Sequence, residues 1–119
     1  SSGKLSFTPT LQLMEQFSTQ KPISFNQQQN TVIGVVATNA ALTKEQTNLV
    51  AQMAQDGVAR CIRPAHTLVD GDTLFALSTT DFQADVNLVG ALAVEAVSLA
   101  ILQAVKTASN AGGLPGLCI

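Results

Sequence analysis

The sequence predicts an α/β (α+β) fold in which strands and helices alternate along one chain of 119 residues. Two observations support this prediction. There are two short apolar runs with the composition of strands, and each is followed by a longer stretch in which apolar residues recur at helical spacing. The order strand–helix–strand–helix is typical of a small sheet covered by helices. Because both runs are apolar throughout, we expect each strand to be covered on both faces.

The first thirty residues differ in composition from the rest. Four apolar residues between positions 11 and 17 predict one face of a short helix after Pro9, and Pro22 ends the pattern. The polar tract 24–30 has the composition of an exposed loop, where a chain is most easily cut. We therefore predict a boundary between residues 1–30 and residues 31–119. A plain linker is the alternative interpretation of this tract.

The first strand is predicted from Val32 to Ala37, a short run rich in β-branched residues. Thr31 stands at its head, directly after the polar tract. A cut before Thr31 would leave one residue with both a nucleophilic hydroxyl and a free α-amine to act as its base. From the residues alone, a threonine at the start of a strand is more often a simple strand former, so both interpretations stay open.

The first long helix is predicted to begin with a capping box formed by Thr43 and Gln46. Its apolar face continues to Ile62, and Cys61 on that face is interpreted as a small buried hydrophobe. Pro64 disfavours helical geometry at the preceding residue and ends the element. The polar residues between the apolar positions are predicted to be exposed: Gln52, Gln55, Asp56 and Arg60.

A polar turn over 65–72 is predicted to lead into a second strand from Thr73 to Ser78. Asp85 is the predicted cap of a helix from Val86 to about Ala108. Part of this helix is long enough to suggest a membrane span. A buried core helix is favoured because the segment is rich in alanine and contains polar residues, namely Asn87, Glu95, Ser98 and Gln103.

Composition restricts the classes of partner. The net charge is −2 and the six basic residues are scattered, which argues against nucleic acid. The two cysteines, Cys61 and Cys118, form no CxxC pair, and we expect neither a metal site nor a cofactor. With 46% hydrophobic and 12% charged residues, the chain is expected to bury surface against a partner chain or copies of itself. We expect a cytoplasmic location and no membrane partner; a periplasmic location stays open, because the true N-terminus can lie upstream.

Besides Thr31, two features are candidates for chemistry. Asp70 and Asp72 flank Gly71; such a segment is usually a turn, but its carboxylates can also converge to hold a hydroxyl or an ammonium. His66 lies just upstream, where a structural role is more common than a catalytic one.

The run from Asn30 to Ala40, the segments 52–57 and 62–67, and the segment from Asp70 to Thr79 together resemble peptidase family S58 in its β-subunit region. That family includes L-aminopeptidase/D-esterases, β-peptidyl aminopeptidases and 6-aminohexanoate-oligomer endohydrolases. The resemblance is strong over residues 30–80. Over residues 85–108 it is limited to the pattern of residues, and residues 1–29 show no match. It implies a four-layer αββα sandwich in which residues 31–119 are the catalytic β-subunit and residues 1–30 a tail or the end of the pre-cleavage segment.

The resemblance also implies a site and a mechanism. Family precursors cut themselves before a Ser or Thr, which here matches the bond between Asn30 and Thr31, with Thr31 as the N-terminal nucleophile. Asp70 and Asp72 match two catalytic-site aspartates of the nylon-oligomer hydrolases, whereas β-peptidyl aminopeptidases have Ser and Glu there. The implied substrates are small peptides or amides, with no cofactor and no metal.

The implied partners are an α-subunit, or upstream segment of the same precursor, and further αβ units in a homo-oligomer. A family precursor is much longer than this chain, so half of the sandwich and several site residues lie elsewhere. Two alternatives remain. One is an acyltransferase with the fold of the ornithine acetyltransferases, which also cut before a threonine; the other is a non-catalytic interaction module, which has no need of Thr31 or of the two aspartates.

Overall fold

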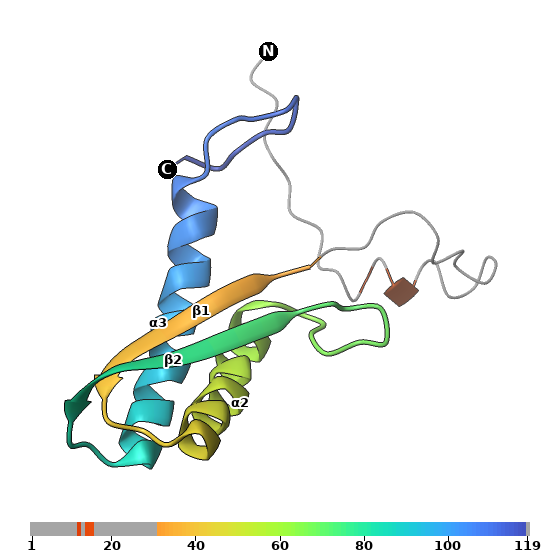
Figure 1. Cartoon of the computed structure of the whole chain (residues 1–119). Coiled ribbons are helices and arrows are strands. Elements are labelled where there is room, and N and C mark those ends of the chain that lie inside the picture. Colours follow the sequence, from red (N-terminus) through yellow and green to blue (C-terminus); the bar gives the residue numbers. More distant parts are fainter. Residues whose placement is uncertain (1–11, 13, 16–30, 119) are drawn as a thin grey trace.

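The computed structural model describes residues 12, 14–15 and 31–118. Along the chain these residues form strand β1 (Ile33–Ala40), helix α2 (Lys44–Cys61), strand β2 (Thr73–Phe82) and helix α3 (Val86–Thr107). The two strands lie side by side in a parallel sheet, with both helices on the same side of it (Figure 1). The mixed α/β class is confirmed. Of the short helix predicted near the N-terminus, the three described positions are helical and the others lie outside the described residues.

The inner face of the sheet carries the core. Val36 of β1 is buried, and Leu74 and Ala76 of β2 are half-buried on the same face. Because side chains alternate along a strand, every second residue points toward the helices. The buried cluster joins β1 to both helices and consists of Val36, Val50, Ala54, Val58, Ala93 and Val97.

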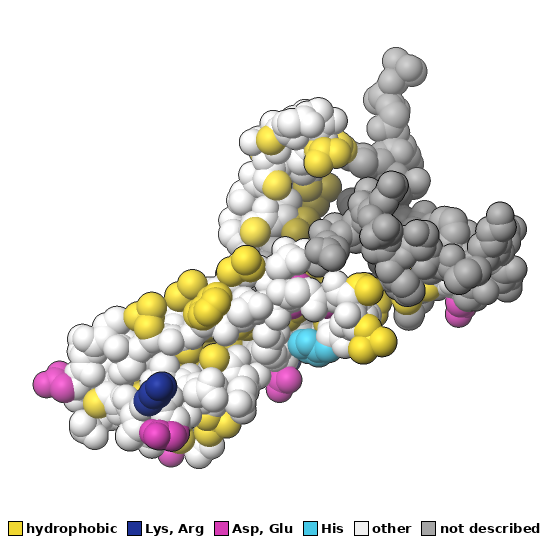
Figure 2. Space-filling view, turned by 45° about the vertical axis from the view of Figure 1, so that its right-hand side comes forward, with side chains coloured by type: hydrophobic (Ala, Val, Ile, Leu, Met, Phe, Trp, Pro, Cys, Tyr) yellow, Lys and Arg dark blue, Asp and Glu magenta, His cyan; other side chains and the backbone are white. Residues whose placement is uncertain are grey.

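The outer face of the sheet is apolar and open. Ile33 and Val35 of β1 are 70% and 62% exposed. In the register Phe75 of β2 pairs with Val35, and the exposed Leu77 pairs with Ala37. The sequence predicts strands covered on both faces, but the described residues supply a layer of helices on one face only. The four-layer sandwich therefore remains a prediction. Figure 2 shows many exposed hydrophobic side chains and few charged ones on the face that it views.

Strand β2 is longer than predicted. The sequence indicates an end at Ser78, whereas the strand continues to Phe82. Polar side chains make this extension possible, because Thr79 Oγ1 donates to the Thr38 carbonyl at 3.1 Å and the Thr80 hydroxyl donates to Asn39. These contacts follow an irregularity in the pairing near Thr38, which a pattern of hydrophobic residues does not predict.

Helix α2 begins as predicted. The Gln46 N–H donates to Thr43 Oγ1 at 3.2 Å and the Thr43 N–H donates to Gln46 Oε1 at 3.0 Å, which completes the capping box. Such a cap stabilises a helix by about 1 kcal/mol. The predicted exposed face is wrong at one position, since Gln55 is half-buried and reaches the turn before β2.

Helix α3 has one buried stripe. Asp85 Oδ1 accepts from the N–H groups of Asn87 and Leu88 at 2.9 and 3.0 Å and caps the helix as predicted. Val94 and Val97 are buried, whereas the opposite side exposes several leucines. The C-terminal half of α3 extends beyond the sheet (Figure 1). By length and composition alone α3 is able to cross a membrane, and 17% of its most apolar window is buried here.

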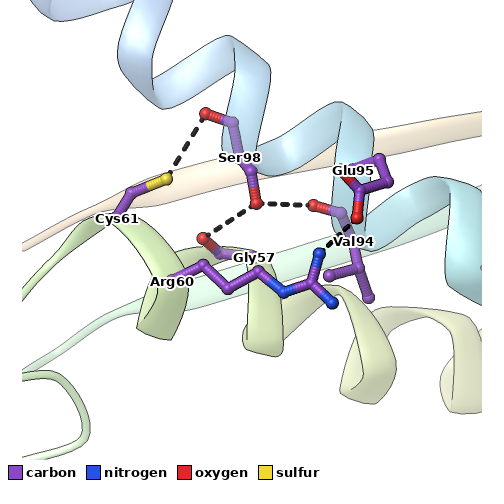
Figure 3. A network of polar contacts seen from close by, with 6 residues as sticks. All are labelled: Gly57, Arg60, Cys61, Val94, Glu95 and Ser98. Atoms are coloured by element: carbon purple, nitrogen blue, oxygen red, sulfur yellow. Dashed lines mark hydrogen bonds and ion pairs between the residues drawn. The ribbon is translucent and has the colours of Figure 1, made fainter.

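Close contact between α2 and α3 depends on Gly57. A Cβ atom on this residue would lie 2.7 Å from the Val94 carbonyl oxygen and 2.9 Å from Val97 Cβ, so only glycine fits without a shift. Next to it, the buried Ser98 hydroxyl donates to the Val94 carbonyl at 2.9 Å and lies 3.4 Å from the Gly57 carbonyl (Figure 3). The Ser98 hydroxyl thus has acceptors on both helices.

Two further contacts extend this junction. Cys61 Sγ lies 3.4 Å from the Ser98 carbonyl oxygen, and the Arg60 guanidinium pairs with the Glu95 carboxylate (Figure 3). Cys61 is half-buried, so the burial predicted for its side chain is only partial. The ion pair is exposed on both sides, so it contributes little to stability.

We expect the Gly57→Ala variant to lower the free energy of unfolding by about 1–3 kcal/mol, because backbone and a β-branched side chain must move to admit the methyl group. Gly90→Ala is the matched control. The three atoms nearest to its new Cβ all belong to the flexible side chain of Met53, so its loss should be smaller. Urea unfolding of both variants in the complete precursor measures the difference; equal losses would contradict the close packing at Gly57.

Candidate active site

The candidate site lies where the two parallel strands begin. Ile33 pairs with Thr73 at the first position of the register, and the Thr73 N–H donates to the Val32 carbonyl at 2.9 Å. The amino ends of parallel neighbours meet at one edge of a sheet. Thr31, just before β1, and Asp72, just before β2, are therefore brought together across forty residues of sequence.

Asp72 holds the backbone next to Thr31. The Val32 N–H donates to Asp72 Oδ1 at 2.8 Å, the length of a charge-assisted hydrogen bond. The other carboxylate oxygen of Asp72 has no hydrogen-bond partner within 31–118 or the few described residues before it. Asp72 thus holds the backbone next to Thr31 and retains one carboxylate oxygen without a partner among the described residues.

Gly71 forms the floor under Thr31. A Cβ atom on Gly71 would lie 3.0 Å from Thr31 Oγ1 and 3.5 Å from its methyl carbon. The Thr31 side chain therefore rests on the backbone between the two aspartates. Because this space would be taken up by any larger residue, the central glycine of the Asp-Gly-Asp segment serves the close approach of Thr31 and not only a turn.

Asp70 is oriented by its own loop. Asp70 Oδ2 accepts from the Thr67 N–H at 2.8 Å, while the Asp70 N–H donates to the Thr67 carbonyl at 3.2 Å. This reciprocal pair closes the loop 67–70, in the manner of an aspartate that stabilises a turn. One oxygen of the Asp70 carboxylate is used by the loop, so its orientation is set before any substrate binds.

All three predicted site residues line one cavity of about 830 Å³. Its wall is largely apolar, and among the described residues that line it Arg63 is the one basic side chain. The cavity is large enough for a small peptide or amide. Its lining consists of Met14, Thr31, Val32, Ile62, Arg63, Pro64, Thr67, Leu68, Val69, Asp70 and Asp72.

His66 is separate from this group. It is exposed, adopts a left-handed backbone conformation with φ of 60°, and does not line the cavity. The structure thus gives no support for a catalytic role of His66. Asn30, the residue before the predicted cleavage point, lies outside the described residues. Within the described part of the chain, no group of three or more His, Cys, Asp or Glu residues is arranged to hold a metal ion.

Two contributors to the site were not identified from the sequence. The sequence alone suggests only a turn at Gly71, because the approach of Thr31 to Gly71 depends on how the two strands pair. Gln55 appears as part of the exposed face of α2, although its Nε2 lies 3.4 Å from the Asp72 carbonyl oxygen. A glutamine opposite a stripe of apolar residues carries no local signal for such a contact.

Comparison with known proteins gives one family. The model described as Peptidase family S58 matches residues 4–118 of the chain. The similarity therefore also covers most of 1–29, where the residues by themselves show no match. It includes every predicted site residue, Asn30 among them.

Similar proteins carry the names of hydrolases. An uncharacterized aminopeptidase of Mycobacterium leprae is 43% identical, over 75% of this chain and 29% of the relative. An uncharacterized aminopeptidase of Mycobacterium tuberculosis is 39% identical, over 77% of this chain and 31% of the relative. A 6-aminohexanoate-oligomer endohydrolase of Kocuria sp. is 31% identical, over 82% of this chain and 31% of the relative. The chain thus spans less than a third of the length of these relatives.

Proposed function

The chain belongs to peptidase family S58, and on this basis we propose that it is the nucleophile-bearing part of a self-processing amide hydrolase of the aminopeptidase type. Thr31 is the nucleophile, and Asp70 and Asp72 hold the reacting groups. The names of the similar proteins support hydrolysis of an amide or peptide bond. The chain spans less than a third of the length of these relatives, so the activity is proposed for the complete precursor.

The observation that carries this proposal is the position of the Thr31 side chain. It lies against Gly71, the residue between Asp70 and Asp72 in the sequence, and all three polar residues line the same cavity. A threonine that only formed a strand would need neither the aspartates nor the cavity. Thr31 is also exposed, so a substrate can reach it.

In the proposed self-cleavage, Thr31 Oγ1 attacks the Asn30 carbonyl carbon. The amide C–N bond breaks as the new C–O bond forms, and the nitrogen gains the proton of the hydroxyl and leaves as the α-amine of Thr31. Water then hydrolyses the ester, which releases Asn30 as a carboxylate and regenerates the Thr31 hydroxyl. The hydrogen bond from Val32 to Asp72 holds the following residue still during this exchange.

In the proposed turnover, the freed α-amine of Thr31 takes the hydroxyl proton while Oγ1 attacks the substrate carbonyl. The leaving amine receives the proton and departs, and water hydrolyses the acyl ester. Asp72 and Asp70 each have one carboxylate oxygen that is engaged and one that has no partner in the described part of the chain. These free oxygens are suited to hold the ammonium and the hydroxyl of Thr31.

The proposed partner is the upstream segment of the same precursor, in an αβ unit that assembles into a homo-oligomer. Two apolar surfaces support it: the open face of the sheet, with Ile33, Val35 and Phe75, and the exposed side of α3, with Leu92 and Leu99. Exposed areas of this kind usually mark an interface. The second sheet of the proposed sandwich would cover the first of them, and the upstream segment would supply the donors for the oxyanion.

Expression of the complete precursor tests the proposal by intact mass. We expect a C-terminal fragment that begins at Thr31, together with hydrolysis of amino-acid p-nitroanilides. A complete precursor that stays uncut would contradict self-processing. Cleavage with acyl transfer to an added amine, but without hydrolysis, would instead favour the acyltransferase alternative.

A further inference from the structure

Gln55 connects helix α2 to the candidate site. It lies in the middle of the helix, and its Nε2 is 3.4 Å from the Asp72 carbonyl oxygen, seventeen residues away along the chain. Among the described residues this is the one side-chain hydrogen bond from a helix to the segment from Asp70 to Asp72. The contact is long, so it restrains this peptide group without locking it.

The second polar atom of the Gln55 amide is unusual. Its Oε1 is buried and has no hydrogen-bond partner among the described residues. A buried acceptor without a partner is unfavourable, and an apolar side chain of the same length would avoid this cost. The glutamine is thus poorly explained by packing alone. The one favourable polar contact that it makes is with Asp72.

Asp72 is held from two sides. Its carbonyl oxygen faces Gln55 on the helix, while its carboxylate accepts from the Val32 N–H on β1. The next residue, Thr73, is fixed by its own N–H bond to Val32. Loss of the contact with Gln55 would leave the peptide group between Asp72 and Thr73 restrained from one side only. The Asp72 carboxylate would keep its hydrogen bond to the Val32 N–H, but it would stand on a less restrained backbone beside Thr31.

We propose that Gln55 is a positioning residue for the reaction at Thr31, acting by holding the backbone of Asp72. The inference rests on the proposed function and extends it to a helix residue that does not line the cavity. A displacement of about 1 Å at a catalytic group can reduce a rate by about a hundredfold. Gln55 therefore affects the rate of the chemical step more than the binding of substrate.

The free Oε1 makes the Gln55→Met variant a clean test. Methionine keeps the length of the side chain and removes both polar atoms. Of these, Nε2 is the donor to Asp72, and Oε1 has no partner among the described residues, so the variant removes one hydrogen bond only. In the complete precursor we expect kcat, and the rate of self-cleavage, to fall about 10- to 100-fold. We expect KM to stay within about twofold and Tm to be unchanged or higher.

Gln52→Met is the matched control, because Gln52 is exposed on the same helix three residues earlier. It should leave kcat, KM and Tm at the values of the unmodified protein. If Gln55→Met folds and retains full kcat, the positioning role is overturned. A fall in kcat that matches the loss of folded protein would also overturn it. An unmodified precursor that neither cuts itself nor hydrolyses amides would instead remove the proposed function, and this inference with it.

Gln55→Glu provides a second and independent readout. Its carboxyl group can donate to the Asp72 carbonyl only when protonated, and its pKa should lie above the ordinary value of about 4.3 because the site is partly buried. The ratio of its kcat to that of the unmodified protein should therefore rise as the pH is lowered toward this pKa. A ratio that does not change with pH would show that the donated hydrogen bond has no role.

Discussion

We expect the Thr31→Ala precursor to stay uncut and to hydrolyse no amide substrate. Alanine removes the oxygen that would attack Asn30 in the precursor and the substrate carbonyl in the mature protein, so both reactions lose their nucleophile. Removal of a nucleophile commonly lowers kcat by 10⁴-fold or more, on the order of 10⁶ where a complete catalytic set is intact. Intact mass and a p-nitroanilide assay measure the two losses separately.

The fold should tolerate this change. Thr31 is exposed and lies before the first residue of β1, and its side chain contacts the backbone of Gly71. The free energy of unfolding should therefore change by about 0.5 kcal/mol or less. Thr31→Ser is the matched control, since it keeps the oxygen and removes only the methyl group, and it should retain both reactions. Self-cleavage that persists in Thr31→Ala would place the nucleophile at another residue.

Local signals were sufficient for the helices. The capping box of Thr43 and Gln46 and the cap at Asp85 are interactions within four residues, so the sequence alone predicts where α2 and α3 begin. The buried positions of α2 also follow from spacing, as Val50 and Val58 confirm. The covering of the sheet does not follow from spacing. Ile33 and Val35 are as apolar as a buried face requires, yet both are exposed and no described residue forms a layer over them.

The geometry of the site required the structure. Thr31 and Asp72 meet because β1 and β2 pair in parallel with Ile33 opposite Thr73, and the sequence contains no signal for this register. The sequence suggested Thr31, Asp70 and Asp72 as a group through resemblance to a family. It assigned Gly71 to a turn and Gln55 to the solvent, because both contacts bridge segments that are distant along the chain.

The second large effect concerns the charge of Asp72. Asp72→Asn keeps an oxygen that can accept from the Val32 N–H, so the backbone beside Thr31 should remain in place. It removes the negative charge that would stabilise the ammonium of Thr31. We expect kcat/KM to fall about 10²- to 10³-fold, within the range for loss of one electrostatic contact in an active site. Asp72→Ala should lower kcat/KM further, because it also leaves the Val32 N–H without its acceptor.

Asp56→Asn is the control for a change of net charge, since Asp56 is exposed on α2 and does not line the cavity. It should leave kcat/KM unchanged. The comparison with Asp70→Asn separates two roles. One carboxylate oxygen of Asp70 accepts from the Thr67 N–H. In the Asp70→Asn variant the amide oxygen can still accept this bond and keep the loop closed. The charge is then lost from a residue that does not bond to the Val32 backbone. If the Asp72→Asn enzyme matched the unmodified one, the free oxygen of Asp72 would have no part in catalysis. The carboxylate would then serve only to fix the chain at β1.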